Sequence, residues 1–115
     1  MVVFRKFGGF YSAYDDDALI LHYLFGYKIK ESRVGFPTGS IDKIIDKLNE
    51  LHINYKVDDK NIVFDDNKYD YYLANSKNRI SIDYKIKEIQ NKINDLDFNS
   101  LNELINIIDN YLNEK

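Results

Sequence analysis

The residues that could do chemistry fall into small groups, and neither the acidic group nor the histidines have the spacing of a catalytic or metal site. Asp15, Asp16 and Asp17 are consecutive carboxylates with no spaced partner to complete a metal site, and a helix start explains them as well. His22 lies in an apolar run, His52 follows another, and the chain has no cysteine. Because catalysis needs a reactive group beside an oriented partner, we expect no enzyme, no metal and no cofactor.

Aromatic rings beside a glycine pair form a group that suits binding. Phe10, Tyr11 and Ser12 directly follow Gly8 and Gly9, where a bare backbone can bend or approach a ligand closely. Side chains alternate along a strand, so one ring is expected in the core and the other outside, and a purely structural role for both stays open. Three further rings could stack on bases, although packing is the simpler role for them: Tyr69, Tyr71 and Tyr72.

Cations in the first half of the chain are the candidates for phosphate contacts, and a solvated surface is the alternative. Residues 1–57 carry eight basic and seven acidic side chains, whereas residues 58–115 carry eight and twelve. The net charge of −3 argues against a strong non-specific nucleic-acid binder, and an anionic partner would meet the first half. The candidate cations are Arg5, Lys6, Lys28, Lys30 and Arg33.

Length and composition predict one folding unit with a single core. The 115 residues are 44% hydrophobic and 30% charged, which is ordinary for a globular protein. No apolar run approaches the ~20 residues that span a bilayer, and the start of the chain does not read as a signal peptide. Together with the absence of cysteine, this predicts a cytoplasmic protein without membrane contact.

The first two thirds of the chain predict a mixture of strands and helices. A helix follows Asp15–Asp17 and stops at Gly26, and a second, clearly amphipathic helix covers residues 41–51 behind a cap at Thr38 or Ser40. Strands are predicted at residues 2–7, 10–14, 27–32, 33–37, 53–57 and 61–64. The first two could also be one strand kinked at the glycines, and the last two form a hairpin.

The last third predicts two helices. Residues 69–74 are a strand or an irregular segment, and isoleucines at three- and four-residue spacing then predict a helix over residues 80–94. A second helix begins at Ser100, with Glu103 completing a capping box. The short link makes the two helices antiparallel neighbours, which could dock on the sheet or mediate dimerisation.

The order of elements predicts an α/β (α+β) fold. A mixed sheet with packed helices occupies residues 1–75, and an antiparallel helical hairpin occupies residues 76–115. The hairpin belongs to the same domain or forms an interface.

Two motifs in this order resemble the amino-terminal mismatch-recognition domain (domain I) of the MutS family of DNA mismatch-repair proteins. "FRKFGGFYSAYDDDA" is similar to the G-D-F-Y-E-L-F segment of that family and its D-D-A helix start. "VGFPTGSIDKIIDKLNELHINYKV" is similar to the G-I/V/F-P motif, the K-L-containing helix and the following strand. The resemblance covers about residues 3–57 and implies a domain I-like fold. Stand-alone domains of this kind occur in small proteins of bacterial phages and mobile elements.

The resemblance implies DNA-contacting residues at the glycine bend. Phe10 occupies the position of the ring that wedges into the minor groove, flanked by Tyr11 and by Ser12, which replaces the family's base-contacting Glu. The family's Asp is Gly9 here, and there is no phosphate-binding loop, so no ATPase is expected. Matches to structural residues of the family are Gly8, Tyr11, Tyr14, Asp16, Asp17, Ala18, Gly35 and Pro37.

Two functions from different classes follow. The first is a non-catalytic module for weak binding of double-stranded DNA or sensing of DNA shape, with Phe10 as wedge and the candidate cations on phosphates. The second is a protein-interaction or adaptor protein of a phage or mobile element that binds no DNA. In that case a protein partner or a second copy docks on the helices of residues 80–112.

Overall fold

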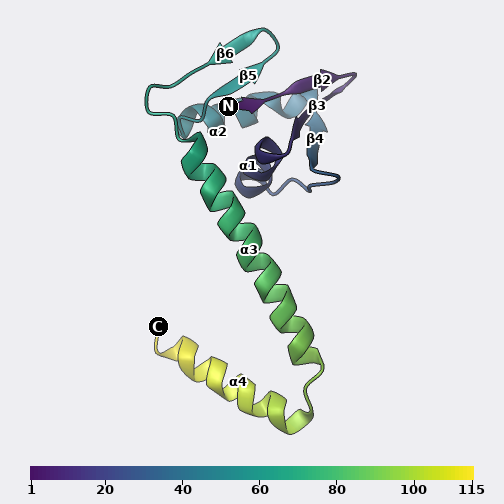
Figure 1. Ribbon diagram of the computed structural model, residues 1–115, viewed down its shortest axis with the longest axis vertical. Coiled ribbons are helices and arrows are strands. Elements are labelled where there is room, and N and C mark those ends of the chain that lie inside the picture. Colours follow the sequence, from purple (N-terminus) through teal and green to yellow (C-terminus); the bar gives the residue numbers. More distant parts are fainter. The chain divides into compact units, whose positions relative to one another are not determined.

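The computed structural model describes residues 1–115 and contains two compact units, Met1–Arg79 and Ile80–Lys115. All six strands and the first two helices belong to the first unit (Figure 1). The boundary lies later than the expected one after residue 75, because helix α3 (Tyr69–Asn94) runs across it without a break. None of the helices combines the length and the apolar character that crossing a membrane requires.

Strands of the first unit form two three-stranded sheets rather than the single mixed sheet that the sequence predicts. The mixed sheet has the order β1–β5–β6, in which β1 is parallel to β5, and the antiparallel sheet has the order β2–β3–β4. The strands are β1 (Val2–Val3), β2 (Arg5–Phe7), β3 (Phe10–Tyr14), β4 (Arg33–Pro37), β5 (Tyr55–Val57) and β6 (Lys60–Ile62). The mixed α/β class is thus confirmed, and the amino-terminal segment contributes one strand to each sheet.

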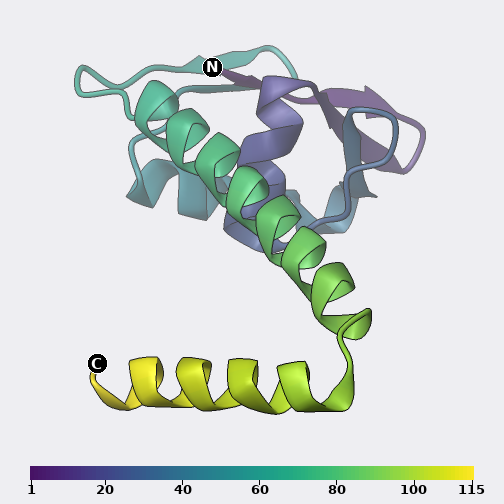
Figure 2. The same cartoon turned by 60° about the horizontal axis from the view of Figure 1, so that its bottom comes forward.

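A cluster of aromatic rings and aliphatic side chains forms the core between the sheets and two helices. The rings of Phe4, Tyr11 and Phe36 meet with centroid distances of 5.9 to 6.4 Å. Helices α1 (Asp16–Phe25) and α2 (Ile41–Glu50) lie beside the strands and bury one face each (Figure 2). The buried helical residues are Ala18, Ile20, Leu21, Ile44 and Leu48. The burial of α2 follows from its amphipathic spacing, whereas α1 is apolar on most of its circumference.

The segment 27–32 is not the strand that its alternating pattern predicts. Tyr27 and Ile29 are half-buried against the core, as alternation requires. However, the only sheet-like pairing is an isolated bridge between Lys30 and Arg33, separated by two residues with positive φ. The alternating pattern therefore predicted correctly which side chains are covered. The predicted strand does not form, because the tight turn prevents a ladder of backbone hydrogen bonds.

Helix α3 begins at Tyr69, so the predicted strand or irregular segment at 69–74 is wrong. The N–H of Lys68 donates to the carbonyl of His52 at 2.8 Å, and the N–H of Tyr69 donates to Asn67 Oδ1 at 3.1 Å. These bonds hold the chain at the helix start, and the side chain of Asn67 satisfies a backbone donor there.

Helix α4 (Phe98–Asn113) starts two residues before the predicted start at Ser100. Asp97 is the N-cap, and its Oδ1 accepts from the N–H of Ser100 at 2.7 Å. Ser40 stands at the N-cap of α2, but its side chain makes no capping hydrogen bond. The helix that ends at Gly26, with φ 74°, and the hairpin of β5 and β6 agree with the sequence.

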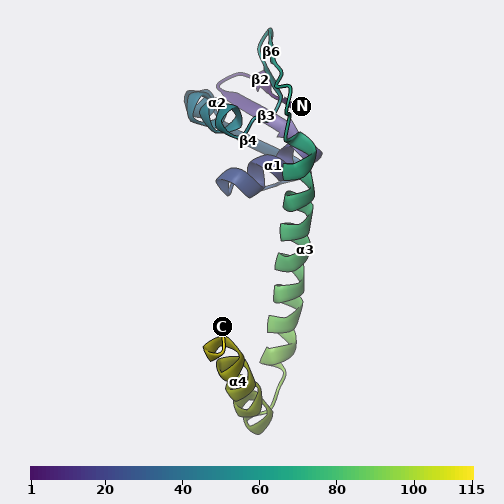
Figure 3. The same cartoon turned by 90° about the vertical axis from the view of Figure 1, so that its left-hand side faces the viewer.

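The second unit is a helical hairpin, in which the chain turns back after α3 into α4 (Figure 3). None of its residues from 80 to 115 is buried. The first unit therefore contains the whole hydrophobic core.

Asp17 joins three elements of the first unit. Its Oδ2 accepts from the N–H of Val3 at 3.0 Å, and its Oδ1 accepts from the hydroxyl of Tyr69 at 2.6 Å. The carboxylate at the start of α1 thereby fixes both β1 and the start of α3. We expected Asp17 only as a helix-start charge, and its long-range partners were not visible in the sequence.

Replacement of Asp17 by alanine should lower the free energy of unfolding by about 2–3 kcal/mol, because two half-buried donors lose a charged acceptor. Urea unfolding followed by far-ultraviolet circular dichroism measures the loss. Asp16→Ala is the matched control, since Asp16 lies in the same helical turn and has only an exposed 3.9 Å ion pair with Lys77. Its loss should stay below about 1 kcal/mol. Equal losses in both variants would show that Asp17 acts only as a charge.

The contribution of Asp17 to stability should decrease as the pH rises. Burial raises the pKa of its carboxyl, opposed by the hydrogen bonds from Tyr69 and Val3. The folded protein then binds this proton more tightly than the unfolded chain, so stability is lost as the pH rises from the unfolded pKa through the folded one. Unfolding of wild type and Asp17→Ala over a pH series should show a larger difference at the acidic end.

Asp66 provides the control of opposite sign for this pH series. A hydrogen bond from His52 lowers the pKa of Asp66, so its contribution is lost as the pH falls through the folded pKa. The difference in free energy of unfolding between Asp66→Asn and wild type should therefore be smaller at the acidic end of the series. The same trend in both variants would contradict the assignment.

Candidate nucleic-acid interface

The register of strand β3 decides which of the predicted site residues can meet a ligand. Phe10 and Tyr14 are exposed, whereas Tyr11, Ser12 and Ala13 are buried. Ser12 lies on the same face as Phe10 and Tyr14, at the bottom of that face. Both neighbouring strands pair with β3 in an unbroken antiparallel register. The strand thus presents three alternate side chains on the face that lies away from the core.

The outer face of the β2–β3–β4 sheet collects aromatic and cationic side chains. Residues opposite one another across antiparallel strands lie on the same face, so the pairings of β3 define this face completely. Its members are Arg5, Phe7, Phe10, Ser12, Tyr14, Arg33, Gly35 and Pro37. This set holds two arginines and no carboxylate, in a chain whose net charge is −3. We call it the outer sheet face.

A hollow of about 620 Å³ lies on the outer sheet face. Ser12 and Gly35 are opposite each other, and a Cβ placed on Gly35 would stand 3.7 Å from Ser12 Oγ. Two small residues therefore leave room at the centre of the face. The lining residues are Arg5, Lys6, Phe7, Phe10, Ser12, Tyr14, Arg33 and Gly35. A volume in this range is typical of small-molecule pockets, so a planar group such as a base would have room in it.

Phe7 and Phe10 stand at the rim because of the glycine turn. They close a two-residue hairpin over Gly8 and Gly9, and Gly8 has φ 59° whereas Gly9 has no positive φ. This combination is typical of a type II′ turn, which requires glycine at its first central position. The two rings are 87% and 57% exposed. The structure thus decides for a hairpin over one kinked strand, and the hairpin presents a pair of rings to solvent.

The prediction that Tyr11 contacts DNA has to be corrected. Its ring is 4% exposed, and its hydroxyl donates to both carboxylate oxygens of Asp58, at 3.0 and 3.1 Å. Burial, together with this hydrogen bond, raises the pKa of Tyr11. Alternation predicted that one of the two neighbouring rings would be buried, and the structure identifies it as Tyr11.

The predicted cations separate into two sets. Arg5, Lys6 and Arg33 line the hollow, and Lys6 Nζ stands 5.8 Å from the centroid of the Tyr11 ring. Lys28 and Lys30 are exposed in the segment before β4 and do not line it. We did not identify Phe7, Tyr14 or Gly35 as site residues from the sequence, although Phe7 and Tyr14 share the alternation of Phe10 and could have been found by it.

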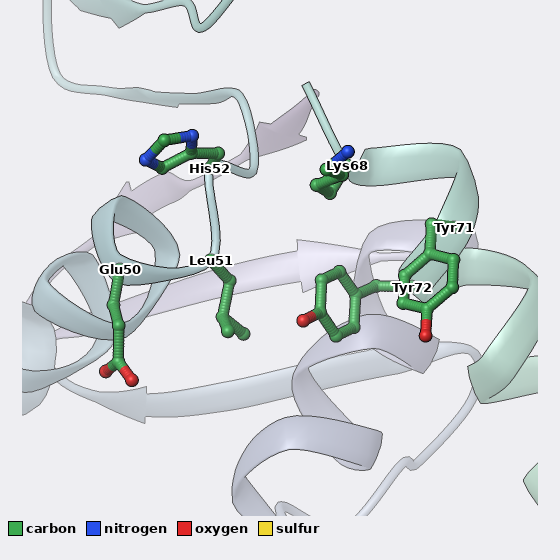
Figure 4. Close-up of a pocket in the computed structure, with 6 residues that line it drawn as sticks. All are labelled: Glu50, Leu51, His52, Lys68, Tyr71 and Tyr72. Atoms are coloured by element: carbon green, nitrogen blue, oxygen red, sulfur yellow. The ribbon is translucent and has the colours of Figure 1, made fainter. Parts of the chain in front are cut away.

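A second cavity, of about 390 Å³, lies between the end of α2 and the start of α3 (Figure 4). Leu51 and Tyr72 point toward one another across it, and Glu50, His52, Lys68 and Tyr71 complete its lining. His52 is held by other groups, because its ring stacks on Phe64 at 4.9 Å and its Nδ1 donates to Asp66 at 2.8 Å. The imidazole is thus a structural link.

The other histidine, His22, makes a structural contact. His22 Nδ1 contacts the carbonyl of Tyr27 at 2.7 Å, which closes the end of α1. No three acidic or histidine side chains come close enough together to hold a metal ion. The outer sheet face therefore remains the strongest candidate for function.

Comparisons with protein-family models, with curated proteins and with solved structures found no match to this chain. The resemblance to domain I consequently depends on the two sequence motifs.

Proposed function

We propose that the protein is a non-catalytic DNA-binding module that uses the outer sheet face to hold an unstacked base of a distorted duplex. The observation that supports this most directly is the hollow floored by Ser12 and Gly35, with Phe7 and Phe10 at its rim and Arg5 and Arg33 beside it. Rings stack on any base, and arginines contact phosphates.

Charge distribution supports an anionic ligand on this face. The protein is acidic as a whole, yet the outer sheet face carries two arginines and no carboxylate. On this face phosphates would therefore meet arginines without a carboxylate among them. With so few cations, the affinity is weak and depends on salt.

The rim rings support a wedge more than a flat stacking platform. Phe7 and Phe10 are on the hairpin, where the sheet ends, so the turn can enter a groove while the sheet stays outside. An apolar wedge inserts most easily where a base step is already weak, as at a bulge. Ser12 places a hydroxyl in the hollow instead of a carboxylate, so the site selects unstacked bases in general rather than one mispair.

Phe10→Ala should weaken binding to a duplex with a single-base bulge by about tenfold, because stacking on one ring is worth about 1–3 kcal/mol. Fluorescence anisotropy with labelled homoduplex, bulged duplex and single-stranded DNA measures this. Wild type should prefer the bulged duplex, and the variant should lose that preference. Tyr84→Ala is the matched control, since Tyr84 is 77% exposed but lies in the other unit, on the side of α3 away from Ile82 and Ile86. Equal binding of all three DNAs by wild type, or an unaffected Phe10→Ala, would contradict the wedge.

Removal of the arginines should reduce the salt dependence of binding. Arg5→Gln and Arg33→Gln should each lower the slope of log K against log salt by about 0.9 if each residue contacts one phosphate of a duplex. Lys56→Gln removes the same charge from an exposed position on the other sheet and should leave the slope unchanged. A slope that falls equally in all three variants would indicate a diffuse effect of net charge.

A further inference from the structure

The helical hairpin carries apolar side chains that nothing in its own unit covers. The spacing of Ile82, Ile86, Ile89 and Ile93 is four, three and four residues, which is the a/d pattern of helices that pack lengthwise. Ile82, Ile86 and Ile89 are each about half exposed. Eleven of the large exposed hydrophobic side chains of the chain belong to this unit. A soluble monomer rarely exposes so much apolar surface in one place.

The apolar face of α4 is too wide for one neighbouring helix. At 100° per residue, its apolar side chains cover about 180° of the helix circumference, and Ser100 is the one polar residue of α4 within that arc. The apolar members are Phe98, Leu101, Leu104, Ile105, Ile107, Ile108, Tyr111 and Leu112. A seam with a single partner needs only the a and d positions. This face therefore fits a helix that packs against two neighbours, as in a four-helix bundle.

The charges of the two helices complement each other. Helix α4 contains Glu103 and Asp109 and no basic residue. The part of α3 in the second unit carries three lysines, Lys85, Lys87 and Lys92, against two carboxylates. A partner for α4 should thus be an amphipathic helix with a basic excess, and α3 of another copy has both properties.

We propose that the hairpin of residues 80–115 pairs with the hairpin of a second copy and forms an antiparallel four-helix bundle. The two helices do not pack lengthwise against each other in the single chain. In the two-fold arrangement they close, so that each α4 packs against α3 of its own chain and α3 of the other chain. The bundle covers the apolar faces of both helices and brings the acidic helices next to the lysine-bearing ones. The dimer is independent of the proposed DNA contact, since it uses a different unit.

Sedimentation equilibrium from low micromolar to submillimolar concentration tests the dimer. Wild type should approach twice the mass of the chain, and Ile108→Asp should raise the dissociation constant by at least about 100-fold, because each copy would bury an unpaired carboxylate. Asn110→Asp is the matched control, since it adds the same charge on the polar face of α4, and it should leave the dissociation constant unchanged. A wild type that stays monomeric, or that forms larger assemblies, would overturn the proposal.

A second variant separates association from helix formation. Ile86→Ala in α3 removes apolar contact but favours the helix, so it should raise the dissociation constant about tenfold while circular dichroism of the associated form is unchanged. Asn91→Ala on the polar side of the same helix is its control, since Asn91 is exposed and uncharged. If a dimer persists unaltered in both Ile108→Asp and Ile86→Ala, another surface makes it and the bundle is excluded.

Discussion

The pairing register of strand β3 is the constraint on which the rest of the first unit depends. Tyr11 fixes that register, because its ring packs among Phe4 and Phe36 while its hydroxyl reaches Asp58 in the turn of the other sheet. A slip by one residue would expose Tyr11 and bury Phe10 and Tyr14, since side chains alternate between faces. The same contact that joins the two sheets therefore also holds the rings of the outer sheet face toward solvent.

Exposure of these rings is a cost that the core has to offset. A buried phenylalanine contributes about 1.5–3 kcal/mol relative to an exposed one, so Phe7 and Phe10 forgo that stabilisation. Ser12 and Gly35 add to this loss of stabilisation, because larger side chains at these positions would fill the hollow and bury more surface. The exposed rings are therefore in agreement with the proposal that a ligand covers this face.

The sequence predicted most of the elements and half of the site because both depend on local periodicity. Alternation in β3 predicted that one of Phe10 and Tyr11 is buried and the other exposed, and the glycine pair predicted a turn. The predictions that were wrong or missing concern contacts between residues that are far apart in the sequence. The ordered start of α3 rests on His52 and Asn67, and the role of Asp17 rests on Val3 and Tyr69. Lys28 and Lys30 have the positive charge that a phosphate contact needs, but they do not line the hollow. They precede a tight turn with two positive φ angles, which the alternating pattern does not predict.

The two units are stabilised in different ways, and this bears on how the carboxy-terminal helix can exist. Helix α3 starts from a turn whose Tyr72 and Leu73 pack against the core and whose Ser76 is buried, so its costly first turn is stabilised by tertiary contacts. Helix α4 has no such anchor, because no residue beyond Arg79 is buried. An isolated helix of its length is marginal in water, and the ordering of each residue costs about 1–2 kcal/mol. Only burial of its wide apolar face can offset that cost, so the order of α4 and the association of the hairpin are expected to be one coupled equilibrium.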